Sequence, residues 1–506
     1  MSDQFTVSLD VPRHPKSSWF EVKSTEYGGF SWKFDARYDS RFLMTISCQP
    51  IENKETLMWR CDAKAEVVVF GKHSNELKLE AQSPILRFLC FNSHADSSER
   101  KVRFFRNGRK ARRIEIKVTI IRSYLVDVSS PNEFISGPSD AARFEIDGRV
   151  VYLSKKMLTR CSPFFAAMFN NDFLEKSTDT YALREVNFRQ VLHLMAIVHR
   201  KTACIDASSI GYLVTLADMY DIREVAELCT AFLSSAEKIE DRESLLELCS
   251  HFDEENTVIE SKIIDLDDHE PDDLDDFKHN FEIGAFRCDL RGVFDDCGDD
   301  ALMLDLFPIE DKRTMLWRFV AENQSESLNT ETIFDHHQDT FGVNYYSCIK
   351  YRDYIPNFNI IVELVQNDVI DLASPGNEFI KDPEDAVCLQ VDGEKLWFSK
   401  TLIALTCPPI CDLFKEAKSI YVIDNVIKYD YRMFLHFMAI LHSNKFVIDE
   451  RTVEYLLEMA DRFCCSYVAD RCEAFLLDPK CGLSRNKLVD LADRHQLLEL
   501  MMKLSA

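Results

Sequence analysis

The stretch Ser130-Pro131-Asn132-Glu133-Phe134-Ile135 occurs again, with one insertion, as Ser374-Pro375-Gly376-Asn377-Glu378-Phe379-Ile380. Two more pairs of segments follow at a constant separation of 245 residues: Ile146-Asp147-Gly148 with Val391-Asp392-Gly393, and Leu153-Ser154-Lys155 with Phe398-Ser399-Lys400. A fourth pair is separated by 243 residues: Leu194-Met195-Ala196-Ile197-Val198-His199 and Phe437-Met438-Ala439-Ile440-Leu441-His442. This period is far longer than the roughly 20–50 residues of repeat proteins. The matches therefore indicate a duplicated domain, whose second copy lacks two residues between the positions of Phe169 and His199.

The region before each copy shows a weaker correspondence and a β pattern. Thr56-Leu57-Met58-Trp59-Arg60 is similar to Thr314-Met315-Leu316-Trp317-Arg318, which suggests that this region was duplicated too. Residues 1–125 alternate apolar and polar side chains in short stretches, as half-buried strands do. After Arg143, two strands are predicted to meet at Asp147-Gly148, a favoured hairpin turn. Helical spacing follows, with Val191, Leu194, Met195 and Val198 on one face.

Composition and charge favour a globular protein that binds other proteins. The 506 residues suffice for three or four domains, with 46% apolar and 29% charged residues. A formal net charge of −25 makes nucleic acid an unlikely partner, even though residues 100–122 are basic and are predicted to form a hairpin around Asn107-Gly108. Nucleotide-binding glycine loops and the G-x-S-x-G motif are absent from the sequence. We therefore expect no enzyme, no catalytic residue and no cofactor.

The cysteines and the chain start predict an intracellular protein. The sequence opens without a basic, then apolar, signal segment, so the 17 cysteines are expected to be reduced thiols in the cytoplasm, with the nucleus as a second location. The longest apolar runs are much shorter than the roughly 18 residues that span a membrane. We also expect no metal site: Cys407/Cys411 and Cys464-Cys465 lack zinc-ligand spacing, and the stretch from Asp335 to Asp339 is interpreted as an exposed polar turn.

The duplicated unit resembles the BTB (POZ) domain, in the form found in nematode BTB and MATH-BTB proteins. The resemblance rests on an ordered set of motifs, which in the first copy are Ile146-Asp147-Gly148, Leu153-Ser154-Lys155, Ser162-Pro163-Phe164-Phe165, Asp172-Phe173-Leu174-Glu175-Lys176 and Leu216-Ala217-Asp218-Met219-Tyr220. One departure is shared, because Ser154 and Ser399 stand where the family usually has histidine. The upstream modules resemble degenerate MATH domains, through Tyr27 to Trp32 and Trp59 to Ala63 in the first and Trp317 in the second.

The resemblance implies an α+β multidomain fold, in which two MATH-like β-sandwich modules alternate with two BTB modules. Twelve acidic residues and one lysine between Asp253 and Asp276 predict a solvated linker between the halves. The expected boundaries are 1–126 for the first MATH-like domain, 131–235 for the first BTB domain, 236–252 for its helical extension, 253–276 for the acidic linker, 277–370 for the second, degenerate MATH-like domain, 375–478 for the second BTB domain and 482–506 for a second helical extension.

The resemblance also implies a cullin-docking site in the first copy, at Phe173 and Glu175. Phe173-Leu174-Glu175 has the form φ-x-E, which in BTB adaptors helps to dock the cullin: the apolar side chain enters a pocket and the carboxylate pairs beside it. The alternative is a helix end with an ordinary exposed glutamate. Phe414-Lys415-Glu416 has the same form in the second copy but lies four residues too close to the core helix, so we do not expect it to dock.

Two other sets of residues are candidates for binding. Asp147 with Lys155, and Asp392 with Lys400, correspond to charged positions at the centre of BTB dimers; they are either a charge pair that fixes such an interface or ordinary turn and surface residues. The copies are expected to self-associate, within one chain or between chains. Tyr27, Trp32 and Trp59 are candidates for a substrate groove, although aromatic residues in strands more often belong to a core.

The predicted function is a protein–protein adaptor, which recruits a protein substrate through a MATH-like domain to a cullin-RING ubiquitin ligase through the first BTB copy. The alternative is a BTB scaffold, or a transcription-associated oligomerisation protein, that binds no cullin. Neither function involves a membrane.

Overall fold

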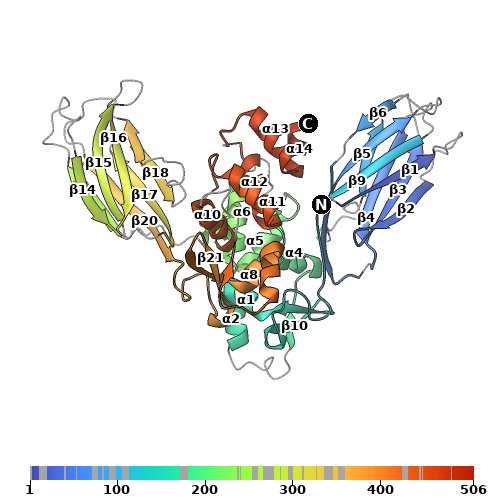
Figure 1. Cartoon of the computed structure of the whole chain (residues 1–506), viewed down its shortest axis with the longest axis horizontal. Coiled ribbons are helices and arrows are strands. Elements are labelled where there is room, and N and C mark those ends of the chain that lie inside the picture. Colours follow the sequence, from blue (N-terminus) through green and yellow to red (C-terminus); the bar gives the residue numbers. More distant parts are fainter. Residues whose placement is uncertain are drawn as a thin grey trace. The chain divides into compact units, whose positions relative to one another are not determined.

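The computed structural model describes most of the chain (Figure 1). The described residues are 3–10, 20–38, 42–52, 54–70, 78–82, 85–89, 99–104, 113–170, 180–235, 239, 241–252, 260–265, 278–284, 286–294, 300–309, 313–325, 328–335, 346–350, 359–423, 431–443, 446, 448–479 and 481–505. They form two compact units: residues Met1–Leu248 together with Ala469–Ala506, and residues Cys249–Val468. Each unit is described by itself.

The first β module consists of two antiparallel sheets. One has the strand order β1 (Asp3–Asp10), β9 (Arg113–Asp127), β5 (Leu57–Phe70) and β6 (Lys78–Gln82), with β7 (Ile85–Leu89) also paired to β5. The other has the order β2 (Phe20–Tyr27), β3 (Phe30–Tyr38), β4 (Phe42–Pro50) and β8 (Glu99–Phe104). The sheets pack face to face, because the ring of Trp32 in β3 lies 5.8 Å from that of Phe88 in β7.

The first α+β module begins with the predicted hairpin. Strands β10 (Ala141–Ile146) and β11 (Arg149–Ser154) are antiparallel, and β12 (Thr180–Leu183) pairs in parallel with β10. Both turn residues have positive φ, 49° at Asp147 and 73° at Gly148, which explains why an Asp-Gly pair is used. A short 3-10 turn, Pro138–Asp140, precedes the hairpin, and the helices that follow it are α1 (Lys155–Cys161), α2 (Pro163–Asn170), α4 (Phe188–Val198), α5 (Ile210–Met219), α6 (Arg223–Ser235) and α7 (Arg242–Ser250).

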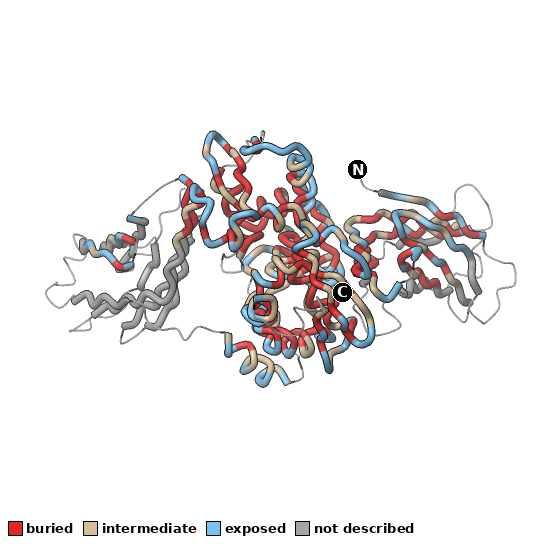
Figure 2. The backbone as a smooth tube through the Cα atoms, turned by 90° about the horizontal axis from the view of Figure 1, so that it is seen from below, coloured by how far each residue is buried: buried red, intermediate tan, exposed pale blue. Residues whose placement is uncertain are grey.

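Helix α4 is the centre of this module. The predicted apolar face of Val191, Leu194, Met195 and Val198 is buried, and so are most of the other residues of the helix. Figure 2 marks the buried residues along the backbone in red. Asn187 caps the start of α4, because its side-chain oxygen accepts hydrogen bonds from the N–H groups of Arg189 and Gln190. Burial on nearly all sides is the pattern of a core helix, and it agrees with the mostly apolar sequence.

The second β module repeats the strand order of the first. One sheet contains β13 (Glu260–Asp265), β20 (Asn359–Asp371), β17 (Met315–Ser325) and β18 (Leu328–Asp335), and the other contains β14 (Lys278–Ile283), β15 (Phe286–Phe294), β16 (Asp300–Pro308) and β19 (Tyr346–Lys350). The central pairs also share an irregularity: the register shifts between Asp62 and Ala63 in β5, and between Val320 and Ala321 in β17. Because these positions correspond in the sequence match, the structure supports duplication of the β module.

The second α+β module follows the same plan. It contains the 3-10 turn Pro383–Asp385, β21 (Ala386–Val391), β22 (Glu394–Ser399), α8 (Lys400–Thr406), α9 (Pro408–Cys411), the 3-10 segment Asp412–Lys415, β23 (Tyr421–Val422), α10 (Tyr431–His442), α11 (Val453–Arg462), α12 (Ser466–Leu477), α13 (Arg485–Arg494) and α14 (Leu498–Ser505). The Asp392-Gly393 turn again has two positive φ angles, 49° and 85°. From Ala469 onward the residues belong to the first unit.

Two expectations from the sequence are wrong in detail. The acidic linker was expected to extend from residue 253 to 276, but Glu260–Asp265 form strand β13, which pairs with β20. This strand takes the place of β1 in the second module. Its short apolar pair, Ile263-Ile264, lies among acidic residues, and the acidic composition favoured a linker. The basic stretch is not a hairpin either, because β8 pairs with β4 while β9 pairs with β1 and β5 in the other sheet.

Candidate functional site

Asp147 and Asp392 lie at the tips of their hairpins and each pairs with an arginine of its own half. The Asp147 carboxylate lies 2.8 Å from Arg149, which also lies 2.6 Å from Glu55 of the preceding β module. In the second half, Arg313 of the β module lies 2.6 Å from Asp392 and 3.6 Å from Glu394. Glu55 corresponds to Arg313, and Arg149 corresponds to Glu394. The contact between β module and hairpin is thus kept in both halves, but with its charges exchanged.

A second junction contact has the same chemistry in both halves. Thr56 donates to Asp127 over 3.0 Å, and Thr314 donates to Asp371 over 2.8 Å. Burial alone would raise the pKa of the Asp127 carboxyl, but hydrogen bonds from Ser129, Lys54 and Thr56 outweigh burial and lower that pKa to about 2. The strand that leaves each β module is therefore fastened by an aspartate side chain where the next module begins, and in the first half this carboxylate is held in its charged form.

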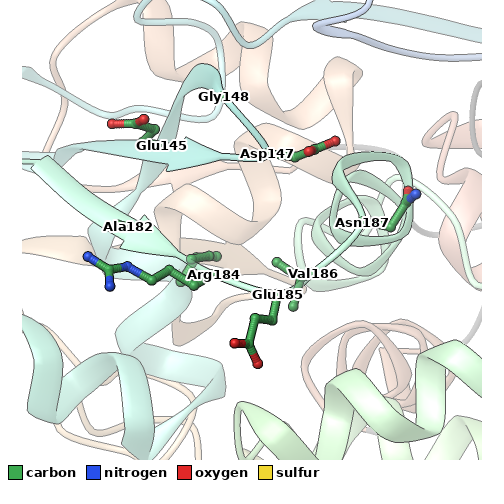
Figure 3. Close-up of a pocket in the computed structure, with 9 residues that line it drawn as sticks. Glu145, Asp147, Gly148, Ala182, Arg184, Glu185, Val186 and Asn187 are labelled. Atoms are coloured by element: carbon green, nitrogen blue, oxygen red, sulfur yellow. The ribbon is translucent and has the colours of Figure 1, made fainter.

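An open pocket lies beside the first hairpin (Figure 3). It has a volume of about 610 Å³ and is lined by the end of β10, by β12 and by the residues that lead into α4: Glu145, Asp147, Gly148, Ala182, Leu183, Arg184, Glu185, Val186 and Asn187. The lining contains three carboxylates, those of Glu145, Asp147 and Glu185, and one guanidinium, that of Arg184, so its net charge is negative and suits a basic side chain. Asp147 is thus an exposed carboxylate at the edge of a concave, acidic surface.

The two lysines predicted to contribute to an interface between BTB copies stand at the start of equivalent helices. Lys155 is the first residue of α1 and is half-buried, whereas Lys400 is the first residue of α8 and is exposed. The ammonium group of Lys400 lies 5.9 Å from the centre of the Phe414 ring. Phe414 itself is half-buried, as is its counterpart Phe169.

The predicted docking residues Phe173 and Glu175 lie outside the described residues, but helix α2, which ends three residues before Phe173 in the sequence, is described, and so is α5. Phe164 in α2 and Met219 at the end of α5 are 39% and 47% exposed, which is high for large apolar side chains. The Phe164 ring lies 5.5 Å from that of Tyr220, the residue after Met219. The second copy has Pro409 and Arg462 at the corresponding positions. The apolar surface therefore belongs to the first copy, and a position-by-position comparison of the copies would have revealed it.

The aromatic residues proposed for a substrate groove occupy different environments. Trp32 is fully buried and Trp59 is 8% exposed, so both contribute to the core of the β module rather than to an open groove. Trp32 packs between Phe5 and Phe88, and its indole N–H donates to the carbonyl of Tyr27 over 3.3 Å. Tyr27 is half-exposed and its ring lies 5.0 Å from that of Phe5. Of the three candidates, only Tyr27 reaches the surface.

Within the described ranges, no cluster of three or more histidine, cysteine or acidic side chains is suited to hold a metal ion. In the same part of the chain, none of the helices combines the length and the apolar character needed to cross a membrane. The stretch from His336 to Asp339 lies outside the described residues.

Comparison with known proteins gives the same two segments as the internal repeat. The model of the BTB/POZ domain matches residues 141–237 and 383–480. BTB and MATH domain-containing protein 38 of Caenorhabditis elegans is 23% identical over 229 residues, which cover 42% of this chain and 58% of that protein. BTB and MATH domain-containing protein 36 of the same organism is 21% identical over 221 residues, which cover 41% of this chain and 67% of that protein. The chain thus carries two segments that match the BTB/POZ domain, and over about two fifths of its length it is similar to these BTB and MATH domain-containing proteins.

Proposed function

We propose that this chain is a non-catalytic adaptor that brings a protein substrate to a cullin-RING ubiquitin ligase. In this proposal the first BTB copy binds the cullin, and the first β module, acting as a MATH-like domain, binds the substrate. The observation that carries the proposal is the exposed apolar surface of Phe164 and Met219 in the first copy. Phe164 lies in α2, which ends three residues before Phe173 in the sequence. Apolar anchors beside a carboxylate are what a docking surface needs.

The second copy is proposed not to bind a cullin. It has Pro409 and Arg462 in place of Phe164 and Met219. From Phe414 to the paired strand residue Tyr421 it also has five residues fewer than the first copy has from Phe169 to Tyr181. Arg462 would place a desolvated charge against an apolar partner surface. We propose that self-association through the BTB copies is its role, with Asp147, Lys155, Asp392 and Lys400 as the charged contacts.

The proposed location is the cytoplasm, with the nucleus as a second compartment. The cysteines whose side chains the structure describes carry free thiols, which supports a reducing environment. A BTB scaffold that binds no cullin remains the second candidate function, and it is favoured by the half-buried position of Lys155 at the start of α1, where BTB pairing is expected.

The test is cullin binding by the full-length chain and its variants, measured by biolayer interferometry with an immobilised cullin of the BTB-binding class. Phe173→Ala should weaken binding more than about tenfold, as expected for a truncated anchor. Met219→Arg, which introduces the residue of the second copy, should do the same. Leu413→Ala, at an exposed apolar position of the second copy, is the matched control and should bind like the wild type.

Glu175→Ala should weaken binding less than Phe173→Ala, and its effect should fade as salt is added. Two results would refute the adaptor function: no cullin binding by the wild-type chain, or full binding by both Phe173→Ala and Met219→Arg. The scaffold function would then take its place.

A further inference from the structure

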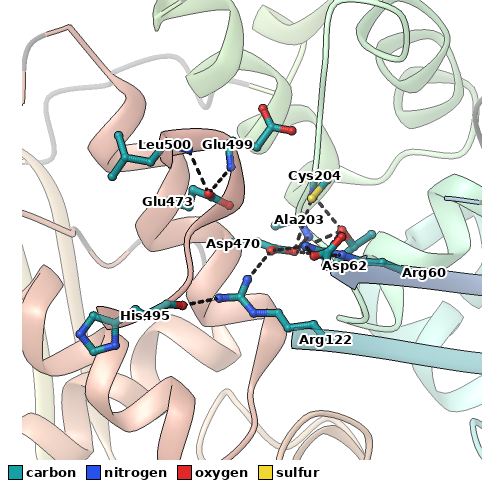
Figure 4. A network of polar contacts seen from close by, with 11 residues as sticks. Arg60, Asp62, Arg122, Ala203, Cys204, Asp470, Glu473, His495, Glu499 and Leu500 are labelled. Carbon is teal, nitrogen blue, oxygen red and sulfur yellow. Dashed lines mark hydrogen bonds and ion pairs between the residues drawn. The ribbon is translucent and has the colours of Figure 1, made fainter. Parts of the chain in front are cut away.

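A buried cluster of charged side chains joins three segments of the first unit that lie far apart in the sequence (Figure 4). Its centre is Arg60 in β5, whose guanidinium forms two hydrogen bonds with the carboxylate of Asp470 in α12, at 2.5 and 2.9 Å. The same guanidinium contacts Asp62 at 2.6 and 2.9 Å. All three side chains are at most 2% exposed. Arginine is suited to this place because its planar group can pair with two carboxylates at once.

The loop after α4 completes the cluster. The hydroxyl group of Thr202 and the backbone N–H of Ala203 donate to Asp470 at 3.2 and 3.1 Å. Arg122, in the neighbouring strand β9, lies 3.3 Å from the same carboxylate and donates to the backbone carbonyl of His495 over 3.5 Å. Two arginines therefore face two aspartates, and each oxygen of Asp470 has partners. A buried charge cluster of this kind is stable only when all its members are present.

The rest of the C-terminal segment, residues 469–506, is also seated in this unit. Lys64 of β5 lies 3.9 Å from Asp493 of α13. Glu473 of α12 accepts hydrogen bonds from the backbone N–H groups of Glu499 and Leu500, which fastens the start of α14. Leu491, Leu497, Leu498 and Leu500 are buried. Apolar burial thus accompanies the charge cluster along the whole segment.

The duplication shows that this arrangement is specific to one half. Glu227 corresponds to Asp470 in the first copy, but it lies 3.5 Å from Arg223 one turn earlier on its own helix and is 34% exposed. Val320 and Gln366 pair across β17 and β20 at the positions where Asp62 and Arg122 pair across β5 and β9. The second β module therefore lacks one acid and one base of the cluster in its sequence.

We propose that the C-terminal segment of this chain is the built-in partner of its first β module, with Asp470 as the docking residue and the site formed by Arg60, Asp62 and Arg122 as its receptor. A protein with a single β–BTB half has no second extension, so the same contact would require a second chain. The tandem chain thus contains within one polypeptide an interface between a β module and the helical extension of another BTB copy. This inference does not depend on cullin binding.

Zero-length cross-linking of the full-length chain tests this proposal. A carbodiimide joins an amine and a carboxylate only when they touch, and Lys64 and Asp493 are both accessible, with side chains 25% and 73% exposed. We expect a Lys64–Asp493 cross-linked peptide in the wild type. In an equimolar mixture of unlabelled and ¹⁵N-labelled chains, this peptide should contain only one isotope. Absence of the cross-link, or a mixed-isotope peptide that shows contact between two chains, would overturn the proposal.

Hydrogen exchange of the full-length chain supplies the second measurement. Asp470→Asn removes the charge but keeps the shape of the docking residue, and it should accelerate exchange of amides in β5 and in residues 485–505 by at least about tenfold, while α10 stays protected. Arg60→Lys, which loses the paired geometry but not the charge, should show the same local pattern. Glu227→Gln is the matched control and should exchange like the wild type. Unchanged exchange in both Asp470→Asn and Arg60→Lys would contradict the proposal.

Discussion

Asp140 and Asp385 show at the scale of single residues how both halves set up the same helix. The buried carboxylate of Asp140 accepts hydrogen bonds from the hydroxyl group of Ser154 and from the backbone N–H of Lys156, and Asp385 does the same with Ser399 and Thr401. Each serine also caps its helix, because its oxygen accepts from the N–H three residues later. Serine therefore has a structural reason to stand where the family usually has histidine.

Asp140→Ala should destabilise the first copy by about 2–3 kcal/mol, because it leaves several buried donors without an acceptor. Urea unfolding followed by hydrogen exchange in α1 would measure this loss. Asp140→Asn, which keeps one accepting oxygen, should cost less. Equal stability of Asp140→Ala and the wild type would show that the serine cap alone is sufficient.

His199 makes the stability of the first copy depend on pH. Burial lowers its pKa to about 4, and its Nδ1 atom donates to the carbonyl of Met195 over 2.8 Å while Nε2 is buried without a partner. Because the folded-state pKa lies below the usual value near 6.5, the unfolded chain binds more protons between these values. The stabilisation is complete above pH 6.5 and is lost as the pH falls toward 4.

The pH contribution of His199 is testable by urea unfolding of α4 at pH 7 and pH 5, followed by hydrogen exchange. In the wild type, His199 alone should lower the free energy of unfolding by about 2 kcal/mol between these two pH values. In His199→Phe that contribution should vanish, whereas the similar contribution of His193, whose pKa burial also lowers to about 4, should remain. An unchanged pH dependence in the variant would contradict this assignment.

At the scale of elements, each β module is matched to its own hairpin by charge. Glu55 faces Arg149 in the first half, whereas Arg313 faces Glu394 in the second. Because the charges are exchanged, each β module would meet a like charge on the hairpin of the other copy: Glu55 would face Glu394, and Arg313 would face Arg149. The contacts are exposed and weak individually, so their effect is to favour the correct neighbour rather than to hold the fold together.

Charge reversal tests this matching. Glu55→Arg and Arg149→Glu should each lower the thermal midpoint of the first half, because each places like charges side by side. The double variant recreates the polarity of the second half and should recover most of the loss. If the thermal midpoint of the double variant falls by the sum of the two single decreases, Glu55 and Arg149 do not interact and do not specify the junction.

The elements that sequence reasoning could find are those with local signals. The Asp-Gly turns and the apolar face of α4 follow from short-range pattern and turn chemistry. Strand β13 is not predictable from composition, because its two isoleucines lie in an acidic stretch. Trp32 and Trp59 are candidates for a groove on sequence grounds, because a strand pattern does not say which face of the strand is buried. The contact between Arg60 and Asp470 joins residues 410 positions apart, and no local pattern carries that information.

At the scale of the whole molecule, the duplication has produced two halves with different surfaces. The first copy keeps an exposed apolar surface at Phe164 and Met219, whereas the second has Pro409 and Arg462 there. The second copy instead ends in a segment that contributes Asp470 to the first unit. We propose that the two copies have separate tasks: the first recruits the ligase, and the second completes the structure of the first unit.

The stoichiometry of the cullin complex tests this account most directly. Full-length chain should be mixed with an excess of the N-terminal domain of a BTB-binding cullin, and the mass of the complex should be measured by light scattering coupled to size exclusion. The account predicts one cullin domain for each chain, whatever the number of chains in the assembly. Two cullin domains for each chain would show that the second copy also docks, and none would show that the protein is not a cullin adaptor.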